Sequence, residues 1–470
     1  MPGMDVFNTL GRHTQTFEPL EPGRVGIYVC GPTVQSRPHV GHGRAAVAFD
    51  VVRRYLAWSG YDVTYVQNVT DIEDKIIAAA ADEGVDPQVL AKRNAETFAA
   101  AYLRLGVGPP DLEPAATDHI PEMIELIETL IAGGHAYSAG GDVYYAVRSF
   151  DGYGKLSGRQ IDDLISGARI EPGEHKRDPL DFALWKAAKP GEPTWDSPWG
   201  PGRPGWHIEC SAMARRYLGD TFDIHAGGND LVFPHHENEI AQSEAATGKP
   251  FARYWLHNGM VDLSGEKMAK STGHVVDLIE ALGTYPPQAV RLFYLRSHYR
   301  KPLDFTAEAL EDAVASLERL WAFRRRAGDP VGRLADPATI AAFRAAMDGD
   351  FDAAGGLAVL FDAVRTGNRL LDAHEDPSAL AAAYDELVEL LGLAEPGRSV
   401  DDIAEALGAL GSRFGVAGDS PWDLVEGLVA TRTAAREQRD WPTADGVRDA
   451  LADLGIVVED AADGSRWHRR

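Results

Sequence analysis

The sequence has few cysteines, no long apolar run and a shortage of basic residues, and each shortage excludes a class of protein. Its 470 residues include two cysteines, Cys30 and Cys210, which are too few for a disulfide-stabilised scaffold. No stretch approaches the roughly 18 consecutive apolar residues of a membrane span, and the N-terminal residues lack the apolar core of a signal peptide. We therefore expect a cytoplasmic protein without a membrane anchor.

The shortage of basic residues bears on possible partners. The chain has 46 Lys and Arg against 71 Asp and Glu, which gives a net charge of −25. A negative overall charge does not favour nucleic acid as a binding partner. Large acidic enzymes can nevertheless bind RNA through a local basic patch, so an RNA partner stays open and local sequence must decide.

A strand, a helix and a second strand are predicted near the N-terminus. The apolar runs VGIYVCG (25–31) and YDVTYVQNV (61–69) flank the helical pattern GHGRAAVAFDVVRRYLAWSG. This order predicts a parallel sheet, and thus an α/β fold. Its ligand crevice should lie beyond the carboxyl ends of the strands, where Cys30, Thr70 and Asp71 are placed.

The pattern changes between about 116 and 205, which we interpret as an insertion. HAYSAGGDVYYAV predicts a hairpin turning at Gly140-Gly141, and a stretch rich in Pro, Gly and Trp follows. The α/β pattern then resumes with a helix near 206–218, the strand FDIHAGG and a helix opening at Pro234. After about 325 the chain is helical, and a small charged module ends it.

Two histidines in GPTVQSRPHVGHGR are candidates for a nucleotide site. His39 and His42 are three residues apart at a predicted helix start, so both imidazoles should face the crevice. The N-terminus of a helix attracts phosphate, and Gly41 leaves room for a nucleotide base. Taken alone, the H-x-G-H pattern also fits two surface histidines.

Two lysines in GEKMAKS are candidates for binding a pyrophosphate leaving group. Lys267 and Lys270 lie in a segment too polar for a core, and their ammonium groups could neutralise charge that develops between the α- and β-phosphates. A solvated basic turn is the alternative for an isolated pair of this kind.

The two cysteines, one histidine and one glutamate are candidates for a zinc site. His235 and Glu239 are four apart on a predicted helix and share a face, whereas His236 has Ile240 at that spacing. Mixed sulfur, nitrogen and oxygen ligands suit zinc. Spacing alone leaves open two buried thiols, a disulfide between them, or a core histidine.

Several segments, in their order along the chain, closely resemble the cysteinyl-tRNA synthetase family. They are GPTVQSRPHVGHGR, NVTDIEDKI, GRPGWHIECSAM, FDIHAGGNDLVFPHHENEIAQSEA, GEKMAKS and the ending RDWPTADGVRDALADLGIVVED. The resemblance implies a class I synthetase with a Rossmann-type catalytic domain, a connective insertion, a helical bundle domain and a small C-terminal anticodon-binding domain. The implied boundaries are 1–115 with 206–260 for the catalytic domain, 116–205 for the insertion, 261–325 for the KMSKS-loop stem-contact region, 326–398 for the helical domain and 399–470 for the anticodon module.

The resemblance also implies site residues. PHVGH matches the family's HIGH motif and KMAKS its KMSKS motif, so His39, His42, Lys267 and Lys270 would be catalytic and would bind ATP. Gly41 and Asp230 would also bind ATP. The zinc ligands would be Cys30, Cys210, His235 and Glu239, which selects His235 over His236. Thr70, Trp206 and His225 would line the cysteine pocket. Arg436, Trp441, Asp445, Arg448 and Asp460 combine a stacking surface with hydrogen-bonding groups and would contact the anticodon.

The implied reaction is ATP-dependent activation of cysteine, with Mg²⁺ bound to ATP, followed by transfer to tRNA(Cys) by a monomer. Zinc would select the cysteine thiolate over a serine hydroxyl, so no editing domain is needed. Gln35 and Ala269 depart from the family's usual Tyr and Ser. Two alternatives are a cysteine:glucosaminyl-inositol ligase of mycothiol synthesis and a non-catalytic RNA-binding or redox paralogue. The tail from about 400 argues against the first, and the retained histidines and lysines argue against the second.

Overall fold

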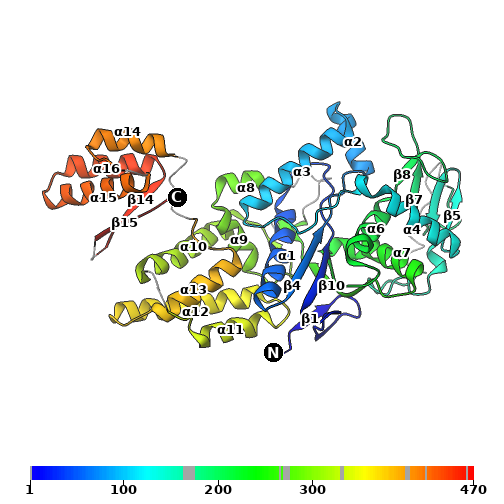
Figure 1. Ribbon diagram of the computed structural model, residues 1–470, viewed down its shortest axis with the longest axis horizontal. Coiled ribbons are helices and arrows are strands. Elements are labelled where there is room, and N and C mark those ends of the chain that lie inside the picture. Colours follow the sequence, from blue (N-terminus) through cyan, green and yellow to red (C-terminus); the bar gives the residue numbers. More distant parts are fainter. Residues whose placement is uncertain are drawn as a thin grey trace. The chain divides into compact units, whose positions relative to one another are not determined.

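The computed structural model describes residues 3–161, 175–263, 266–267, 276–328, 333–396, 403–418, 421–461 and 464–469. Within these ranges the chain forms two compact units, Met1–Leu393 and Ala394–Arg470 (Figure 1). The first unit contains the parallel sheet and its insertion, and the second is a small helical module. In the described part of the chain, every helix is too short or too polar to cross a bilayer.

A four-stranded parallel sheet in the order β10-β9-β3-β4 is the centre of the first unit. Its strands are β3 (Arg24–Val29), β4 (Asp62–Gln67), β9 (Phe222–Gly228) and β10 (Ala252–Asn258). β9 and the second half of β3 are almost entirely buried, as expected for strands covered on both faces. The α/β fold predicted from the alternating pattern is confirmed.

Helices cover both faces of this sheet (Figure 1). They are α1 (Val40–Trp58), α6 (Trp206–Leu218) and α7 (Glu237–Thr247). The chain passes from β3 through α1 to β4 in one direction, and from β9 through α7 to β10 in the other. The strand order therefore reverses between β3 and β9, and ligands of such sheets bind at this reversal point.

Two expected boundaries can be compared directly with the structure. The hairpin at Gly140-Gly141 is confirmed: β5 (Ala136–Ala139) pairs antiparallel with β6 (Asp142–Tyr145), and both glycines have positive φ. The helix expected to open at Pro234 begins later, because a kinked turn, η4 (Val232–His236), in which Phe233 has extended backbone, precedes α7. His235 thus lies in the turn.

The insertion consists of helices and a second, antiparallel sheet in the order β5-β6-β7-β8. Its remaining elements are α4 (Ile120–Ala132), β7 (Phe182–Ala187), β8 (Gly202–Pro204) and the 3-10 turns η1 (Ala116–His119) and η2 (Val147–Ser149). Two helices, α2 (Asp74–Glu83) and α3 (Pro87–Arg104), lie between β4 and the insertion. One buried cluster extends from this sheet through α4 and α6 to β3. The insertion therefore shares a core with the parallel sheet.

The remainder of the first unit is mainly helical. A small sheet joins β11 (Val261–Leu263), β12 (Glu266–Lys267) and β13 (Leu303–Asp304), and a hairpin joins β1 (Asp5–Asn8) and β2 (His13–Thr16). The helices are α8 (Leu278–Thr284), α9 (Pro287–Leu295), α10 (Ala307–Ala327), α11 (Pro337–Met347), α12 (Ala353–Asp372) and α13 (Ser378–Leu391). The turn η3 (Asn229–Leu231) follows β9.

The second unit packs three helices against a hairpin. Its elements are α14 (Ala404–Phe414), α15 (Pro421–Glu437), α16 (Trp441–Asp453), β14 (Ile456–Ala461) and β15 (Gly464–Arg469). A separate hydrophobic core, including Leu407, Leu428, Leu451 and Trp467, holds these elements together. The second unit therefore has the core of an independent domain.

Candidate active site

A cavity of about 350 Å³ opens beyond the carboxyl ends of the parallel strands. Cys30, Gln67, Gly228 and Asn258 reach it from the ends of β3, β4, β9 and β10. The N-terminus of α1 forms another wall, with His39, Gly41 and His42. This is the crevice expected from the strand order, and it brings together the predicted nucleotide-binding histidines and one of the predicted metal ligands.

His39 and His42 cap the start of α1 reciprocally. The backbone N–H of Gly41 donates to His39 Nδ1, and the backbone N–H of His39 donates to His42 Nδ1, both at 3.1 Å. The two rings stack with centroids 3.6 Å apart. Because each Nδ1 accepts a hydrogen bond, the proton of each neutral ring lies on Nε2. Both imidazoles are therefore hydrogen-bond donors through Nε2.

The four predicted metal ligands lie together beside this cavity. Their ligand atoms, from Cys30, Cys210, His235 and Glu239, all lie within 4.8 Å of one another. Cys30 Sγ is 3.7 Å from Cys210 Sγ and 3.5 Å from Glu239 Oε1, and His235 Nε2 is 3.0 Å from the same carboxylate oxygen. Three of the four residues are buried. The cluster is therefore capable of holding a metal ion.

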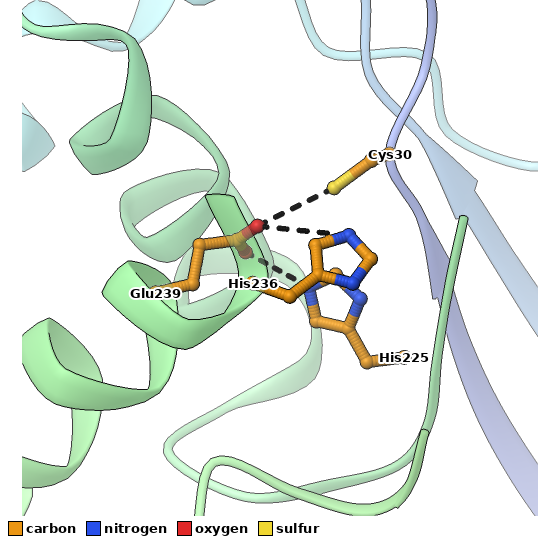
Figure 2. A group of neighbouring side chains, drawn as sticks. All are labelled: Cys30, His225, His236 and Glu239. Atoms are coloured by element: carbon orange, nitrogen blue, oxygen red, sulfur yellow. Dashed lines mark hydrogen bonds and ion pairs between the residues drawn. The ribbon is translucent and has the colours of Figure 1, made fainter. Parts of the chain in front are cut away.

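A second group with the same geometry shares two of these residues. Figure 2 shows Cys30 and Glu239 with His225 and His236, whose ligand atoms also lie within 4.8 Å of one another. His225 Nε2 bonds Glu239 Oε2 at 2.8 Å, and His236 Nδ1 bonds His257 Nε2 at 2.8 Å. Sequence reasoning gave His225 another role, selected His235 over His236 and did not single out His257. The signals in the sequence were the histidine pair in PHHENE and the single histidines in FDIHAGG and YWLHN.

The group that contains both thiols carries strongly perturbed pKa values. A hydrogen bond from Cys30 lowers the pKa of Cys210 to about 6, whereas burial raises the pKa of Cys30. Burial tends to raise the pKa of Glu239, but His225 and His235 hold it well below its usual value. Burial tends to lower the pKa of His235, but Glu239 and Cys210 raise it to about 10. A thiolate and a carboxylate thus face a protonated imidazole within one buried centre, and a bound metal cation would replace that proton.

The predicted cysteine-pocket residues are divided between the cavity and the interior. Trp206 lines the cavity, and its ring stacks on His235 with centroids 4.2 Å apart. Asp230, which was predicted to bind ATP, also lines the cavity. Thr70 and His225 are buried and are not among the described residues that line the cavity. Lys75, which sequence reasoning did not single out, also lines the cavity, and its Nζ lies 5.8 Å from the centre of the Trp206 ring.

The lysine segment is described only in part. Lys267 lies in β12, but its side chain is outside the described atoms, and Lys270 and Ala269 lie outside the described residues. Gln35 lines the cavity, and its buried Oε1 has no hydrogen-bond partner in the ranges that the structure covers.

The predicted tRNA contacts lie in the second unit. Trp441 is 54% exposed at the start of α16, an unusual exposure for a large aromatic side chain. On the same helix, Arg448 pairs with Asp445 at 3.1 Å, and both side chains are exposed. Arg436 is half-buried on α15, and Asp460 lies in β14 with its side chain outside the described atoms.

Three family models match separate parts of the chain. Residues 16–315 match the family described as "tRNA synthetases class I (C) catalytic domain", residues 342–395 match "DALR domain", and residues 423–467 match "Cysteinyl-tRNA ligase anticodon binding domain". A "Cysteine--tRNA ligase" of Desulforudis audaxviator is 50% identical over 99% of this chain and 100% of the relative. Another, of Thioalkalivibrio sulfidiphilus, is 51% identical with the same coverage.

Solved structures of other synthetases share the fold. The Agrobacterium radiobacter K84 agnB2 LeuRS in a ternary complex with tRNA and LeuAMS matches with a TM-score of 0.59 at 13% identity, covering 80% of this chain and 84% of that chain. Mycobacterium tuberculosis methionyl-tRNA synthetase bound by methionyl-adenylate matches with a TM-score of 0.56 at 17% identity, covering 79% and 90%.

The fold and the site together define a class I aminoacyl-tRNA synthetase, which is an enzyme. Within that class, the chain belongs to the cysteine–tRNA ligase family. The resemblance identified from the sequence is confirmed. Neither the mycothiol-type ligase nor the non-catalytic paralogue is favoured by these matches.

Proposed function

We propose that the chain activates cysteine with ATP, forming cysteinyl-adenylate, and then transfers the cysteinyl group to tRNA(Cys). The observation that carries this proposal is the position of a buried donor set with two thiols beside a cavity at the N-terminus of α1. The names of the relatives support the reaction and its amino acid. The tRNA in the LeuRS complex and the adenylate in the methionyl-tRNA synthetase support the two substrates that the cavity must accommodate in turn.

Zinc is the metal that this donor set fits. In a tetrahedral zinc site with Zn–S bonds of about 2.3 Å, two sulfur ligands lie about 3.8 Å apart and a sulfur and a carboxylate oxygen about 3.6 Å apart. The corresponding separations are 3.7 Å for Cys30 and Cys210 and 3.5 Å for Cys30 and Glu239. Cys30, Cys210, His235 and Glu239 would hold the ion, and His225 would orient the Glu239 carboxylate through its second oxygen. When bound, zinc supplies selective affinity for the thiolate of the substrate.

The residues of α1 are suited to the first step. The cysteine carboxylate attacks the α-phosphorus of Mg²⁺-bound ATP, and the bond between that phosphorus and the oxygen bridging to the β-phosphate breaks, so that pyrophosphate leaves. His39 and His42 present Nε2 donors at a helix end with a positive dipole, which suits the phosphate oxygens. Lys267 and Lys270 are assigned to the pyrophosphate by the resemblance, as Gly41 and Asp230 are to the rest of ATP.

The remaining assignments concern the amino acid and tRNA. Trp206 is placed against the substrate cysteine, with Thr70 and His225 supporting it from the interior. In the second step the terminal ribose hydroxyl of tRNA attacks the acyl carbon and AMP leaves. We assign the anticodon to Arg436, Trp441, Asp445, Arg448 and Asp460.

We assign the domains as catalytic in 1–115 and 206–260, connective in 116–205, stem-contacting in 261–325, helical in 326–398 and anticodon-binding in 399–470. A monomer acting in the cytoplasm, where protein synthesis consumes charged tRNA, completes the proposal.

The test combines three measurements on the full chain. We expect near-stoichiometric zinc, cysteine-dependent ATP–pyrophosphate exchange, and charging of tRNA(Cys) with cysteine but not with serine. A Cys30→Ala, Cys210→Ala double variant removes every thiol of the chain, and we expect it to lose both the zinc and most of the selectivity against serine. Zinc that survives in this variant, or transfer of cysteine to an amino-sugar instead of tRNA, would overturn the proposal.

A further inference from the structure

A loop of the insertion, residues 150–159, contacts the start of α7, and we call it the clamp loop. Glu237, the first residue of α7, is fully buried. Its two carboxylate oxygens accept the backbone N–H groups of Gly154 at 2.9 Å, Leu156 at 3.4 Å and Ser157 at 2.7 Å. Three N–H groups of one loop thus converge on a side chain that lies, in sequence, between two of the proposed metal ligands.

Two more contacts join the clamp loop to this segment. The Tyr153 hydroxyl donates to Asn238 Oδ1 at 2.5 Å, and Asn238 is also buried. The guanidinium carbon of Arg159 lies 4.4 Å from the centre of the Phe233 ring. Leu156 anchors the loop itself in the core that the insertion shares with the parallel sheet. The contacts of the clamp loop therefore extend from the η4 turn into the first turn of α7.

The segment that carries His235 and Glu239 needs support from outside its own backbone. The η4 turn is kinked at Phe233, whose φ of −142° and ψ of 130° are extended. The N-cap residue of α7, His236, makes no side-chain capping hydrogen bond within the described part of the chain. A helix start without a cap leaves backbone N–H groups unsatisfied and frays more easily. Tertiary contacts must consequently hold the two metal ligands in place.

The sheet and the insertion each hold one carboxylate of this segment. From β9, His225 Nε2 bonds Glu239 Oε2 at 2.8 Å, and from the insertion the clamp loop bonds Glu237. Ligands that are already held at the spacing of a metal site lose less conformational freedom when the ion binds. The clamp loop therefore contributes to metal affinity without supplying a ligand.

We propose that Glu237, held by the clamp loop, positions His235 and Glu239 and thereby sets the affinity for zinc and the KM for cysteine. This inference rests on the proposed function, which supplies the zinc and the thiol substrate. Glu237 bonds the clamp loop instead of the substrate, so it is a positioning residue. The insertion thus takes part in selecting the amino acid, although no described residue of 116–205 lines the cavity.

The experiment compares three variants of the full chain. Glu237→Gln keeps the size of the side chain but replaces one acceptor oxygen by an amide group that cannot accept. Tyr153→Phe removes one hydrogen bond of the clamp loop and keeps the ring that packs against the core. The control is Asp181→Asn, because Asp181 is another buried carboxylate of the insertion and accepts the backbone N–H groups of Val147 and Asp178, each at 3.1 Å.

Three measurements are made on each zinc-loaded protein. They are the rate of zinc release to an excess of chelator, the urea midpoint, and the KM values for cysteine and for ATP in pyrophosphate exchange with zinc present. Zinc release does not depend on activity, and the urea midpoint reports the stability of the fold. A role confined to stability would change the urea midpoint alone.

We expect Glu237→Gln to release zinc about tenfold faster or more, since lost support around metal ligands typically costs about 10- to 100-fold in affinity. Its KM for cysteine should rise about fivefold or more, while its KM for ATP stays within about twofold. Tyr153→Phe should release zinc about threefold faster, as expected for the loss of one hydrogen bond. Asp181→Asn should lower the urea midpoint but leave zinc release within about twofold of the unchanged chain.

Zinc release and a KM for cysteine that are unchanged in Glu237→Gln would overturn the inference, whatever the urea midpoint. Should Glu237→Gln not fold, Tyr153→Phe decides, and a release rate equal to that of the unchanged chain would be the contrary result. An unchanged chain that holds zinc but lacks cysteine-dependent exchange contradicts the proposed function, and zinc release then still tests the clamp loop. An unchanged chain that binds no zinc overturns both.

Discussion

Glu239 connects the buried polar residues of the site at the scale of single residues. Its carboxylate accepts from Cys30 and contacts His235 through Oε1, and it bonds His225 through Oε2. A buried carboxylate is costly unless it is paired, and here imidazoles surround it. Substituting Glu239 would therefore disturb the metal ligands and the histidines together.

The two overlapping ligand groups give opposite expectations for neighbouring histidines. We predict that His235→Ala loses the bound zinc, because it removes a nitrogen ligand that faces the two thiols. His236→Ala should retain near-stoichiometric zinc, since His236 Nε2 is 4.0 Å from the carboxylate and its other nitrogen bonds His257. Elemental analysis of both purified variants checks this, and the reverse result would assign the ion to the group in Figure 2.

Asp74 gives a prediction about pH. Burial tends to raise its pKa, but ion pairs with Lys186 and Arg203 lower it to about 2. Because this value lies below the unfolded value of about 3.9, the stabilisation is present above about pH 5 and is lost as the pH falls through 4 toward 2. Asp74 is half exposed, so solvent screening limits the contribution to about 0.5 to 1 kcal/mol.

Asp74→Asn should therefore lower the urea midpoint of the first unit equally at pH 7 and pH 5, and by less at pH 3.5. Asp62→Asn is the control, because Asp62 is 76% exposed and lies 3.6 Å from Arg24. If the lowering of the urea midpoint by Asp74→Asn grew as the pH fell, the assigned direction of the Asp74 pKa shift would be contradicted.

Much of the site could be predicted because its chemistry uses rare residues. Cys30 and Cys210 were conspicuous as the two thiols of the chain, and the spacing of His235 and Glu239 placed two ligand types on one face. The choice between His235 and His236 was not available from spacing, since both lie near Glu239 once the kinked η4 turn has formed. Burial was also hidden, because polar residues such as His225 and Glu239 give no sign in the sequence of being enclosed.

At the scale of elements, the close approach of β3 and β4 positions one of the thiols. A Cβ atom on Gly31, directly after Cys30, would lie 1.6 Å from the backbone oxygen of Asn68, which follows β4. The backbone N–H of Gly31 also donates to Asn68 Oδ1 at 2.9 Å. Only glycine allows the two strand ends to meet in this way.

Gly31→Ala should consequently destabilise the first unit by at least about 3 kcal/mol and lower its zinc content, because the backbone must move where Cys30 is held. Gly283→Ala in α8 is the matched control, since no atom lies within 4 Å of the position of its Cβ and alanine favours a helix. Urea unfolding and elemental analysis measure both effects. Stability unchanged in Gly31→Ala would show that the strand ends can separate freely.

Elements with strong local patterns were predictable, and those set by tertiary contacts were less so. The hairpin at Gly140-Gly141 followed from turn chemistry, and α6 followed from its periodicity. The start of α7 differed, because the η4 turn holds His235 and His236 in the interior before the regular helix begins. No local propensity encodes that turn, whose side chains bond to distant segments.

At the scale of the whole molecule, each unit has its own core. The residues assigned to adenylate formation precede Ala394, and the assigned anticodon contacts follow it. We predict that a chain ending at Leu393 folds and retains cysteine-dependent pyrophosphate exchange within about threefold, but charges tRNA at least tenfold less efficiently through weaker binding. The comparison with the intact chain at several tRNA concentrations separates KM from kcat, and undiminished charging would contradict the role of the second unit.

The order of the parallel strands also determines how late in biosynthesis the sheet can be completed. Cys30 and Glu239 are separated by 209 positions, and β3 cannot pair with β9 until the whole insertion has been made. At about 5 to 20 residues per second, a ribosome needs roughly 10 to 40 s to produce that interval. Until Cys210 is made, the newborn chain has one thiol, half of its sheet and an open strand edge, and the insertion that shares the sheet's core is available to shield that edge.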